Sequence, residues 1–379
     1  MIYSLYYLVL QNIYVVKKGV DVMRIEIGNR ILELEKPCRI KELFDNTGYV
    51  YYAASVNNRL RELDYIVSKD SKVELLDIKS SLVTRMYEAT LRYIIVMALR
   101  NIRPKARINF RYSVSRHIFA SVSHLGHPFL QQDLNDLHDE VIRIIKLDLP
   151  ISRFSLTKEE AQEYYRSVGW YDKIDALKYR KNPTVHVYKC GDFYDYMYGY
   201  MLPSTGYLRT FELKLYAPGF LISYPRGDLN GETPELADEK VFREVLKEAN
   251  QWTSITGCGS ISQINKIVEE ERVLEFINIC EARHNDQLAT LGDLITRNSQ
   301  KTRLICVAGP SSSGKTTFTN RLKIELKTRG INPLMISMDD FYLEDQSKYP
   351  KLANGKPDLE HINAIDLELF DSTPSAMCA

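Results

Sequence analysis

The segment that most constrains this chain is Gly309–Thr317, which reads GPSSSGKTT and satisfies the pattern G-x-x-x-x-G-K-[ST]. It lies between an apolar run, residues 304–308, and an amphipathic run, residues 318–329, which Gly330 closes. This order is typical of a strand, a glycine-rich loop and a helix. Such a loop turns backbone N–H groups and the positive end of the helix onto a polyphosphate. The sequence therefore predicts a phosphate-binding loop, with a plain Gly/Ser turn as the alternative.

The pattern also assigns individual roles within the loop. We expect Lys315 to reach the β- and γ-phosphates and to act in catalysis, and the Thr316 hydroxyl to hold Mg²⁺. ATP and Mg²⁺ are thus the expected cofactors. The residues expected to bind the phosphates are Gly309, Ser311, Ser312, Ser313, Gly314, Lys315, Thr316 and Thr317.

A carboxylate pair follows the next apolar run. Residues 331–338 end in Asp339 and Asp340, at the carboxyl end of an expected second parallel strand. Ligands bind at that edge of a doubly wound sheet, and a carboxylate beside the γ-phosphate can accept the proton of an attacking hydroxyl. Asp339 is the predicted general base. In the alternative interpretation both aspartates cap the following turn.

Three segments in order, GPSSSGKTT, ISMDDFY and DLEH leading into AIDLELF, resemble the amino-terminal part of the uridine kinase and phosphoribulokinase family. The resemblance implies that Asp339 is the catalytic carboxylate and that Tyr342 lines a base pocket. It also implies that Glu360, where the family usually has Asp, contacts ribose hydroxyls. The implied reaction transfers the γ-phosphoryl of ATP to the 5′-hydroxyl of a uridine- or cytidine-like nucleoside.

This resemblance spans residues 300–370 only. About 70 residues fall short of a doubly wound sheet, which takes on the order of 150–200 residues. We therefore expect the amino-terminal part of an α/β P-loop NTPase, with its doubly wound parallel sheet incomplete, and a truncated chain of uncertain activity. Residues 371–379 are expected to form an irregular tail.

Two other functions stay open at this stage. The shared motifs define the phosphate donor better than the acceptor, so a phosphoribulokinase-like sugar-phosphate kinase is one alternative. The other is an RNA- or ribosome-associated protein that binds nucleotide as a switch.

Residues 23–80 predict a small mixed sheet around one helix. Residues 24–27 and 31–35 alternate in polarity about Gly28 and Asn29, which indicates a hairpin that begins at Met23. A short helix at 39–44 and strands at 49–56, 63–67 and 73–78 are expected to follow. The segment resembles the β-grasp TGS domains of threonyl-tRNA synthetases, a resemblance that implies binding of RNA or of another protein domain.

Residues 85–235 resemble the editing-type α+β domain that follows TGS in threonyl-tRNA synthetases, beginning with a helix over 85–100. In that family two histidines one helical turn apart and a later Cys-x-x-x-His converge on a metal. The matching positions here are Met86, Thr90, Cys190 and Tyr194. One ligand of four cannot hold zinc, so we expect the fold without its metal site.

A basic run lies in the same region. Between Arg85 and Arg116 there are eight basic residues and one acidic residue, Glu88, although the whole chain of 379 residues has a net charge of only +1. The run predicts either contact with RNA phosphates or a solvated basic face.

The remaining features point to a cytoplasmic protein of α+β multidomain class. Its six cysteines are scattered and contain no C-x-x-C pair, which favours free thiols. Residues 1–22 form an unassigned apolar extension, too short to span a bilayer, for which a weak secretory signal is the alternative. Residues 236–299 are expected to be a helical connector. No membrane contact is expected, and the oligomeric state stays open.

Overall fold

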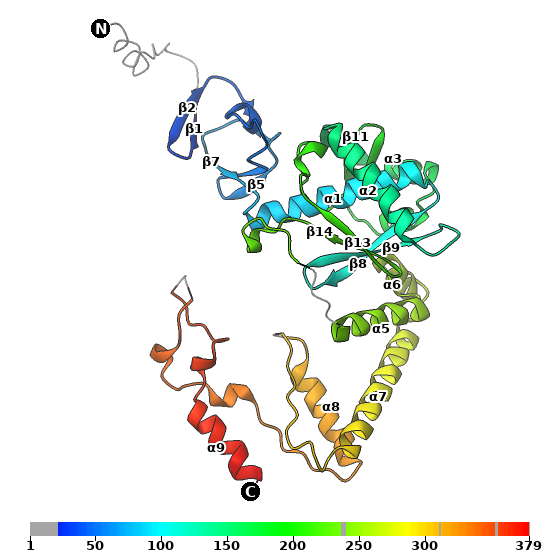
Figure 1. Cartoon of the computed structure of the whole chain (residues 1–379), viewed down its shortest axis with the longest axis vertical. Coiled ribbons are helices and arrows are strands. Elements are labelled where there is room, and N and C mark those ends of the chain that lie inside the picture. Colours follow the sequence, from blue (N-terminus) through cyan, green and yellow to red (C-terminus); the bar gives the residue numbers. More distant parts are fainter. Residues whose placement is uncertain (1–21, 236–239, 311, 353–354, 379) are drawn as a thin grey trace. The chain divides into compact units, whose positions relative to one another are not determined.

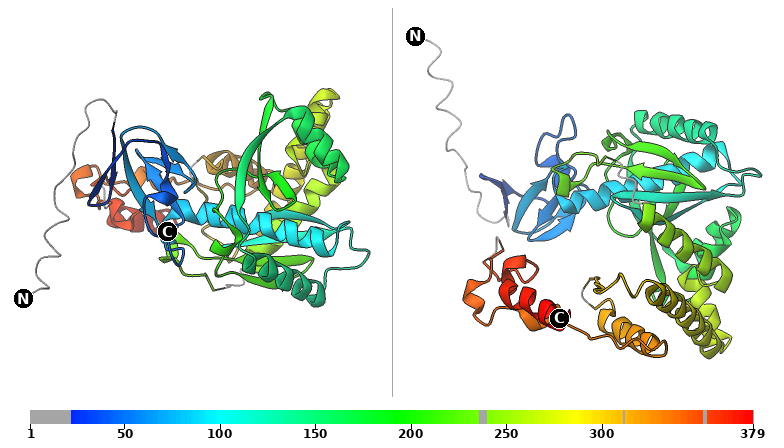
Figure 2. Two further views of the ribbon diagram at one scale, coloured as in Figure 1. Left: turned by 90° about the horizontal axis from the view of Figure 1, so that it is seen from above. Right: turned by 60° about the horizontal axis from the view of Figure 1, so that its bottom comes forward.

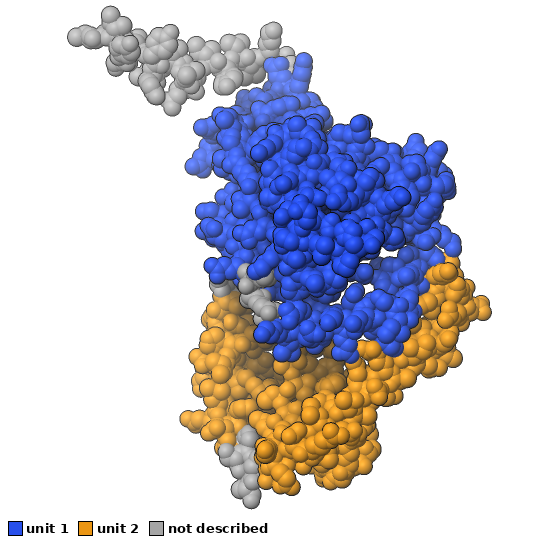
Figure 3. Space-filling view, turned by 45° about the vertical axis from the view of Figure 1, so that its right-hand side comes forward, with its two compact units in different colours: residues 1–265 blue, residues 266–379 orange. Residues whose placement is uncertain are grey.

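The structure is a computed structural model that describes residues 22–235, 240–310, 312–352 and 355–378. It is an α+β chain with several sheets (Figure 1). It divides into two compact units, residues 1–265 and residues 266–379 (Figure 3). Apart from Val22, the predicted amino-terminal extension lies outside the described residues.

Unit 1 begins with a five-stranded mixed sheet of strand order β2-β1-β7-β4-β5. The predicted hairpin is confirmed, with β1 antiparallel to β2 across Gly28, whose φ of +54° suits a glycine. β7 lies parallel to β1 and antiparallel to β4, and β5 forms an edge that the sequence did not predict. The strands are β1 (Met23–Ile27), β2 (Arg30–Leu34), β4 (Ala53–Val56), β5 (Arg59–Arg61) and β7 (Ser71–Leu76), beside a small ladder of β3 (Cys38–Arg39) and β6 (Ile66–Val67).

The rest of unit 1 is organised around the helix α1 (Ser81–Ile102), which confirms the helix predicted over 85–100. Both views of Figure 2 show α1 running from the first sheet into the second domain, where most of its residues are buried. Two antiparallel sheets, β13-β14-β9-β8 and β10-β11-β12, complete that domain. Its other elements are β8 (Arg107–Val114), β9 (His117–Ser123), α2 (Gln131–Lys146), β10 (Ile151–Thr157), α3 (Lys158–Ser167), α4 (Tyr171–Lys178), β11 (Thr184–Cys190), β12 (Phe193–Tyr196), β13 (Glu212–Tyr216) and β14 (Gly219–Ser223).

The two domains of unit 1 share one hydrophobic core and a polar joint. Glu62 accepts hydrogen bonds on Oε1 from the Tyr188 hydroxyl at 2.6 Å and from the Met201 backbone N–H at 3.2 Å. Asn46 Nδ2 donates to the Tyr207 hydroxyl at 3.0 Å. These side-chain hydrogen bonds, together with the shared core, hold the first domain against the second.

The helical stretch that follows is broken twice. α5 (Lys240–Thr256) and α6 (Ile261–Glu269) belong largely to unit 1, and α7 (Val273–Arg297) to unit 2. The second break lies at residues 270–272, where Glu271 has a φ of +57°.

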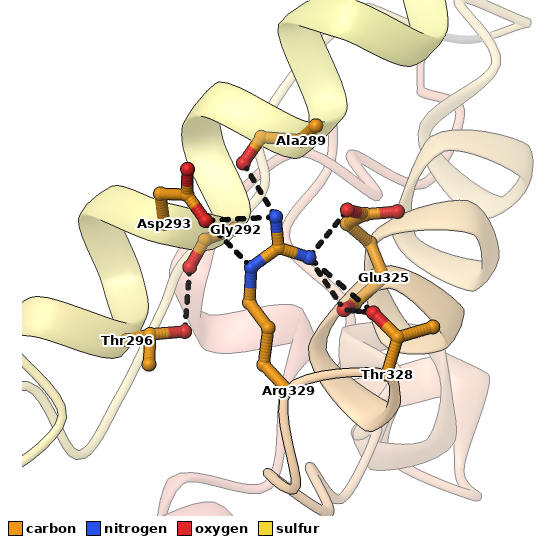
Figure 4. Close-up of polar contacts among 7 residues, drawn as sticks. All are labelled: Ala289, Gly292, Asp293, Thr296, Glu325, Thr328 and Arg329. Atoms are coloured by element: carbon orange, nitrogen blue, oxygen red, sulfur yellow. Dashed lines mark hydrogen bonds and ion pairs between the residues drawn. The ribbon is translucent and has the colours of Figure 1, made fainter.

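In unit 2, α7 packs against α8 (Lys315–Lys327) through a small core of Leu288, Leu322 and Leu326. Arg329 adds a polar link at the end of α8 (Figure 4): its guanidinium donates to the Ala289 carbonyl at 3.0 Å and to Asp293 Oδ1 at 2.9 Å, and pairs with Glu325. This helix pair holds the segment that the sequence predicts to bind phosphate.

Two predicted strands are absent from this unit. Residues 304–308 and 331–337 have no strand assignment, and the Leu304 side chain is 66% exposed. A strand needs a hydrogen-bonded neighbour, and among the described residues these segments find none. The structure therefore does not show a P-loop NTPase fold.

The irregular tail predicted for residues 371–379 is also wrong up to Cys378. α9 (Leu367–Cys378) begins where Asp366 Oδ1 accepts the Leu369 N–H at 3.0 Å. Phe370 packs edge-on against Phe341, with ring centroids 5.2 Å apart. The cap and this ring contact stabilise the start of the helix. The resemblance to the kinase family ends at residue 370 and did not indicate it.

No helix in the described part of the chain combines the length and the apolar character that a bilayer span requires.

Burial at the joint gives Glu62 a testable pH dependence. Burial raises the pKa of the Glu62 carboxyl, against the opposing effect of the Tyr188 hydrogen bond. A carboxyl with a raised folded-state pKa stabilises the fold below its unfolded pKa, and this contribution is lost as the pH rises through the folded pKa. Glu62→Gln keeps an acceptor for Tyr188 and does not ionise. We therefore expect its free energy of unfolding to rise relative to that of the wild type as the pH increases from acidic to neutral. Urea unfolding at several pH values measures the difference.

The control is Glu33→Gln, at an exposed position on β2. The difference in free energy of unfolding between Glu62→Gln and the wild type should change with pH. A difference that stays constant, or one with the same pH dependence as that of Glu33→Gln, would contradict the role of burial.

Candidate functional site

The predicted phosphate loop lies directly before α8. Gly314 precedes the helix with a φ of +85°, a conformation that favours glycine, and Ser312 has a φ of +59°. The helix begins at Lys315, and Thr316 and Thr317 are exposed in its first turn. Ser311 lies outside the described residues. The sequence thus yields the loop and the helix of the expected motif without the strand.

The Lys315 ammonium folds back over this loop. Its Nζ donates to the Gly309 carbonyl at 2.7 Å and to the Pro310 carbonyl at 3.0 Å. A Cβ on Gly309 would meet Ser313 Oγ at 2.8 Å, so a larger residue there would displace the Ser313 hydroxyl. The arrangement gathers a cation and the backbone N–H groups of a helix start at one place, which is the chemistry that binds phosphate.

A second group of predicted residues lies together elsewhere in unit 2. The Tyr342 hydroxyl donates to the Leu359 carbonyl at 3.0 Å, and its pKa is raised by burial first and then by the charges of Asp339 and Glu360. Within the described residues we find no hydrogen bond or ion pair from this group to the loop before α8. The structure therefore brings Asp339 and Glu360 near Tyr342 and, among the described residues, joins none of the three to Lys315 by a hydrogen bond or ion pair.

The turn after residues 331–337 is capped by serine. Ser337 Oγ accepts the Asp339 N–H at 3.4 Å, and the Ser337 carbonyl accepts the Asp340 N–H at 3.2 Å. Asp339 and Asp340 thus lie inside this turn, and their roles as general base or as caps of the following turn stay predictions. Both carboxylates are exposed.

The positions matched to metal ligands in unit 1 are occupied by groups with other partners. Thr90 Oγ1 donates to the Met86 carbonyl at 2.7 Å and accepts the Leu202 N–H at 2.9 Å. Burial raises the pKa of the Cys190 thiol to about 11, and the Tyr194 ring stacks on Tyr164 with centroids 3.6 Å apart. Across the described residues no three His, Cys, Asp or Glu side chains are grouped closely enough to hold a metal ion.

Unit 1 also contains a pocket of about 570 Å³ that the sequence analysis did not identify. We call it the arginine–aromatic pocket, because cations and aromatic rings line it together. Two of its aromatic side chains are open to solvent, with Tyr171 64% and Tyr196 37% exposed. The cations and rings of its lining are Arg92, Arg100, Arg107 and Lys173 with Phe110, Trp170, Tyr171 and Tyr196.

The cations of this pocket are held by the rings and by backbone carbonyls. Arg92 lies over Phe110 at 4.5 Å and Lys173 over Trp170 at 4.2 Å. Arg107 donates to the Gly169 carbonyl at 3.2 Å, and Arg100 Nη1 donates to the Tyr164 hydroxyl at 3.2 Å.

Carboxylates balance only part of this charge. Lys173 pairs with the buried Asp195, and Arg92 with Glu88 at 3.0 Å. Among the described residues Arg100 and Arg107 form no ion pair. The pocket therefore offers positive charge beside exposed aromatic rings, a combination suited to an anionic aromatic ligand.

The sequence contained part of the signal for this pocket. Arg92, Arg100 and Arg107 belong to the basic run at 85–116, for which RNA contact was one of two interpretations. Trp170 and Lys173 lie some 60 residues later and follow no motif that the sequence analysis used. Only the fold brings them to α1 and β8.

The relatives found by sequence comparison are aminoacyl-tRNA synthetases. The chain is 29% identical over 181 residues to the threonine–tRNA ligase of Clostridioides difficile, covering 48% of this chain and 28% of that protein. It is 26% identical over 162 residues to that of Syntrophomonas wolfei, with coverages of 42% and 25%, and 24% identical over 197 residues to that of Desulforamulus reducens, with coverages of 52% and 30%. The chain thus spans 25–30% of the length of these relatives. No protein-family model matches it.

These relatives support the synthetase-like part of the sequence analysis and contradict the predicted function. The expectation of a nucleoside kinase acting on a uridine- or cytidine-like acceptor, or of a phosphoribulokinase, is wrong, because the matched proteins are named as ligases of tRNA. The physical reason for the error is that a glycine-rich loop specifies a phosphate ligand and carries no information about the acceptor. The catalytic roles of Lys315 and Asp339 and the substrate contacts of Tyr342 and Glu360 stay predictions.

We expect the purified chain to hold no stoichiometric zinc and to keep its melting temperature in EDTA. Met86, Thr90 and Tyr194 supply no strong zinc ligand, and a thiol whose pKa is raised by burial is a poor one. Elemental analysis and thermal unfolding check both points. About one zinc per chain, lost in Cys190→Ser, would contradict this expectation.

Proposed function

We propose that the protein binds tRNA through the arginine–aromatic pocket of unit 1 and that it does so without a metal ion. The observation that carries the proposal is the similarity of about half of the chain to proteins named threonine–tRNA ligase. The proposal retains RNA association, one of the alternatives from the sequence, in place of the kinase.

The chemistry of the pocket supports an unpaired nucleotide as the bound group. Proteins recognise single-stranded RNA by stacking bases on aromatic side chains and by contacting phosphates with arginine. Tyr171 and Tyr196 offer exposed rings, and in the part of the chain that the structure describes Arg100 and Arg107 have no paired carboxylate. A volume of about 570 Å³ is in the range of pockets that hold small ligands.

Hydrolysis is not part of the proposal. A metal-dependent reaction would require ligands at the positions of Met86, Thr90 and Tyr194. Met86 is buried in the hydrophobic core, and the side chains of Thr90 and Tyr194 have other partners. The role proposed for unit 1 is therefore recognition.

The proposal includes a second ligand, the phosphates of ATP with Mg²⁺, at the loop before α8. Lys315 would contact the β- and γ-phosphates, and the exposed Thr316 hydroxyl would hold the metal ion. The supporting observations are the left-handed Gly314, the helix start behind it and the position of Lys315 Nζ on the loop carbonyls.

For tRNA, we expect Tyr171→Ala to weaken binding by roughly 5- to 150-fold, the equivalent of about 1–3 kcal/mol for the loss of one base stack. Fluorescence anisotropy with labelled tRNA at fixed salt measures the affinity. The matched control is Tyr198→Ala, since Tyr198 is 88% exposed and does not line the pocket. Equal affinities of the two variants would remove the pocket from the proposal.

For nucleotide, we expect Lys315→Ala to abolish measurable binding of ATP with Mg²⁺, because it removes the cation that lies on the loop. Calorimetry compares it with Lys323→Ala, which removes a cation from the same helix away from the loop. An ATP affinity unchanged in Lys315→Ala would overturn the phosphate-loop assignment.

A further inference from the structure

The first domain of unit 1 has a cationic groove of its own, separate from the arginine–aromatic pocket. It has a volume of about 380 Å³, and no carboxylate is among the residues that line it. It lies where β5 and the segment between β6 and β7 meet. The side chains that give it its character are Arg59, Arg61, Tyr65, Ser68 and Lys69.

The carboxylates nearest in sequence are committed to other partners. Asp64 pairs with Lys41 at 2.6 Å and with Arg39 at 2.9 Å. Glu62 is held by Tyr188 and Met201 in the joint with the second domain. Asp70 accepts the backbone N–H of Arg24 at 2.9 Å. Among the described residues Arg59 and Lys69 consequently have no ion-pair partner.

Arg61 is fixed in place by neutral groups. Its Nη1 donates to the Leu60 carbonyl at 2.9 Å and contacts the Tyr200 hydroxyl at 3.4 Å, and its guanidinium lies 4.9 Å from the centre of the Tyr65 ring. Its charge is oriented by these contacts and not neutralised by them. Such an oriented arginine loses little side-chain entropy when an anion binds.

We propose that this cationic groove binds the phosphodiester backbone of RNA. The inference rests on the proposed tRNA binding and adds a second contact to it. Three uncompensated cations, a serine hydroxyl and a tyrosine ring match the phosphate and sugar groups of a strand, and they read no base sequence. The groove serves affinity and orientation, while the arginine–aromatic pocket receives the unpaired nucleotide.

The test compares Arg59→Ala/Lys69→Ala with Arg30→Ala/Lys36→Ala. The control removes the same charge from the same domain, and Arg30 lies on β2, at the opposite edge of the sheet from β5. Binding of tRNA and of a blunt RNA duplex is measured by anisotropy over a range of salt concentrations, with circular dichroism to verify folding.

The groove variant should bind tRNA roughly tenfold more weakly at 0.15 M salt, and its slope of log K against log salt should be shallower by about 2. The control should match the wild type on both measures. Binding of the duplex should show the same loss in the groove variant and none in Tyr171→Ala.

Equal loss in the two double variants would overturn the groove. A second result would also overturn it. If the groove variant lost affinity for ATP and kept its affinity for RNA, the groove would bind free nucleotide and not the RNA backbone. If the wild type binds the duplex and not tRNA, and this binding still depends on Arg59 and Lys69, the pocket proposal fails and the groove stands.

Discussion

The packing of α1 is the constraint on which unit 1 depends. The helix is buried along most of its 22 residues and contributes to the core of both domains. Polar atoms on its buried face must find partners, and the Tyr93 hydroxyl does so by donating between the Tyr188 carbonyl at 2.9 Å and the Phe193 carbonyl at 3.0 Å. Burial raises the pKa of Tyr93 far above its usual range, so this buried bridge stays neutral.

The same helix supplies the charged wall of the arginine–aromatic pocket. Arg92 and Arg100 leave the buried face and extend over Phe110 and Trp170. One side of α1 is therefore closed by apolar packing, and another side presents cations to a cavity. Of the positions matched to metal ligands, Met86 and Thr90 lie on the closed side of α1, where the Thr90 hydroxyl accepts the Leu202 N–H. The residues that line the pocket and the residues matched to metal ligands are different side chains, so the proposed pocket does not depend on a metal site.

The sequence predicted those parts of the structure that local patterns determine. The hairpin at β1 and β2, the helix α1 and the helix after the glycine-rich loop all follow from periodicity and turn residues, and the structure confirms them. The strands expected at 304–308 and 331–338 failed because a parallel strand depends on neighbours far along the chain, which a local pattern does not specify. The α9 helix replaces the irregular tail expected over residues 371–379 up to Cys378, and its start depends on the cap at Asp366.

The candidate site was predictable only in part, because local patterns do not specify contacts between residues far apart in the chain. The basic run contained three of the pocket's cations, while Trp170 and Lys173 reach it through the fold alone. The cationic groove depends on which carboxylates are already paired, as Asp64 is with Arg39 and Lys41, and pairing of this kind is not visible in a sequence. The kinase prediction was wrong because the glycine-rich loop carries information about the phosphate ligand and none about the group that accepts the phosphoryl.

Hydrogen–deuterium exchange of the full chain with and without saturating tRNA tests the central claim most directly. The account predicts slower exchange on tRNA binding in the segments 100–110 and 169–173, which contain residues that line the arginine–aromatic pocket, and unchanged exchange in β2 at the edge of the first sheet. Saturated binding of tRNA with no added protection in those two segments would contradict it.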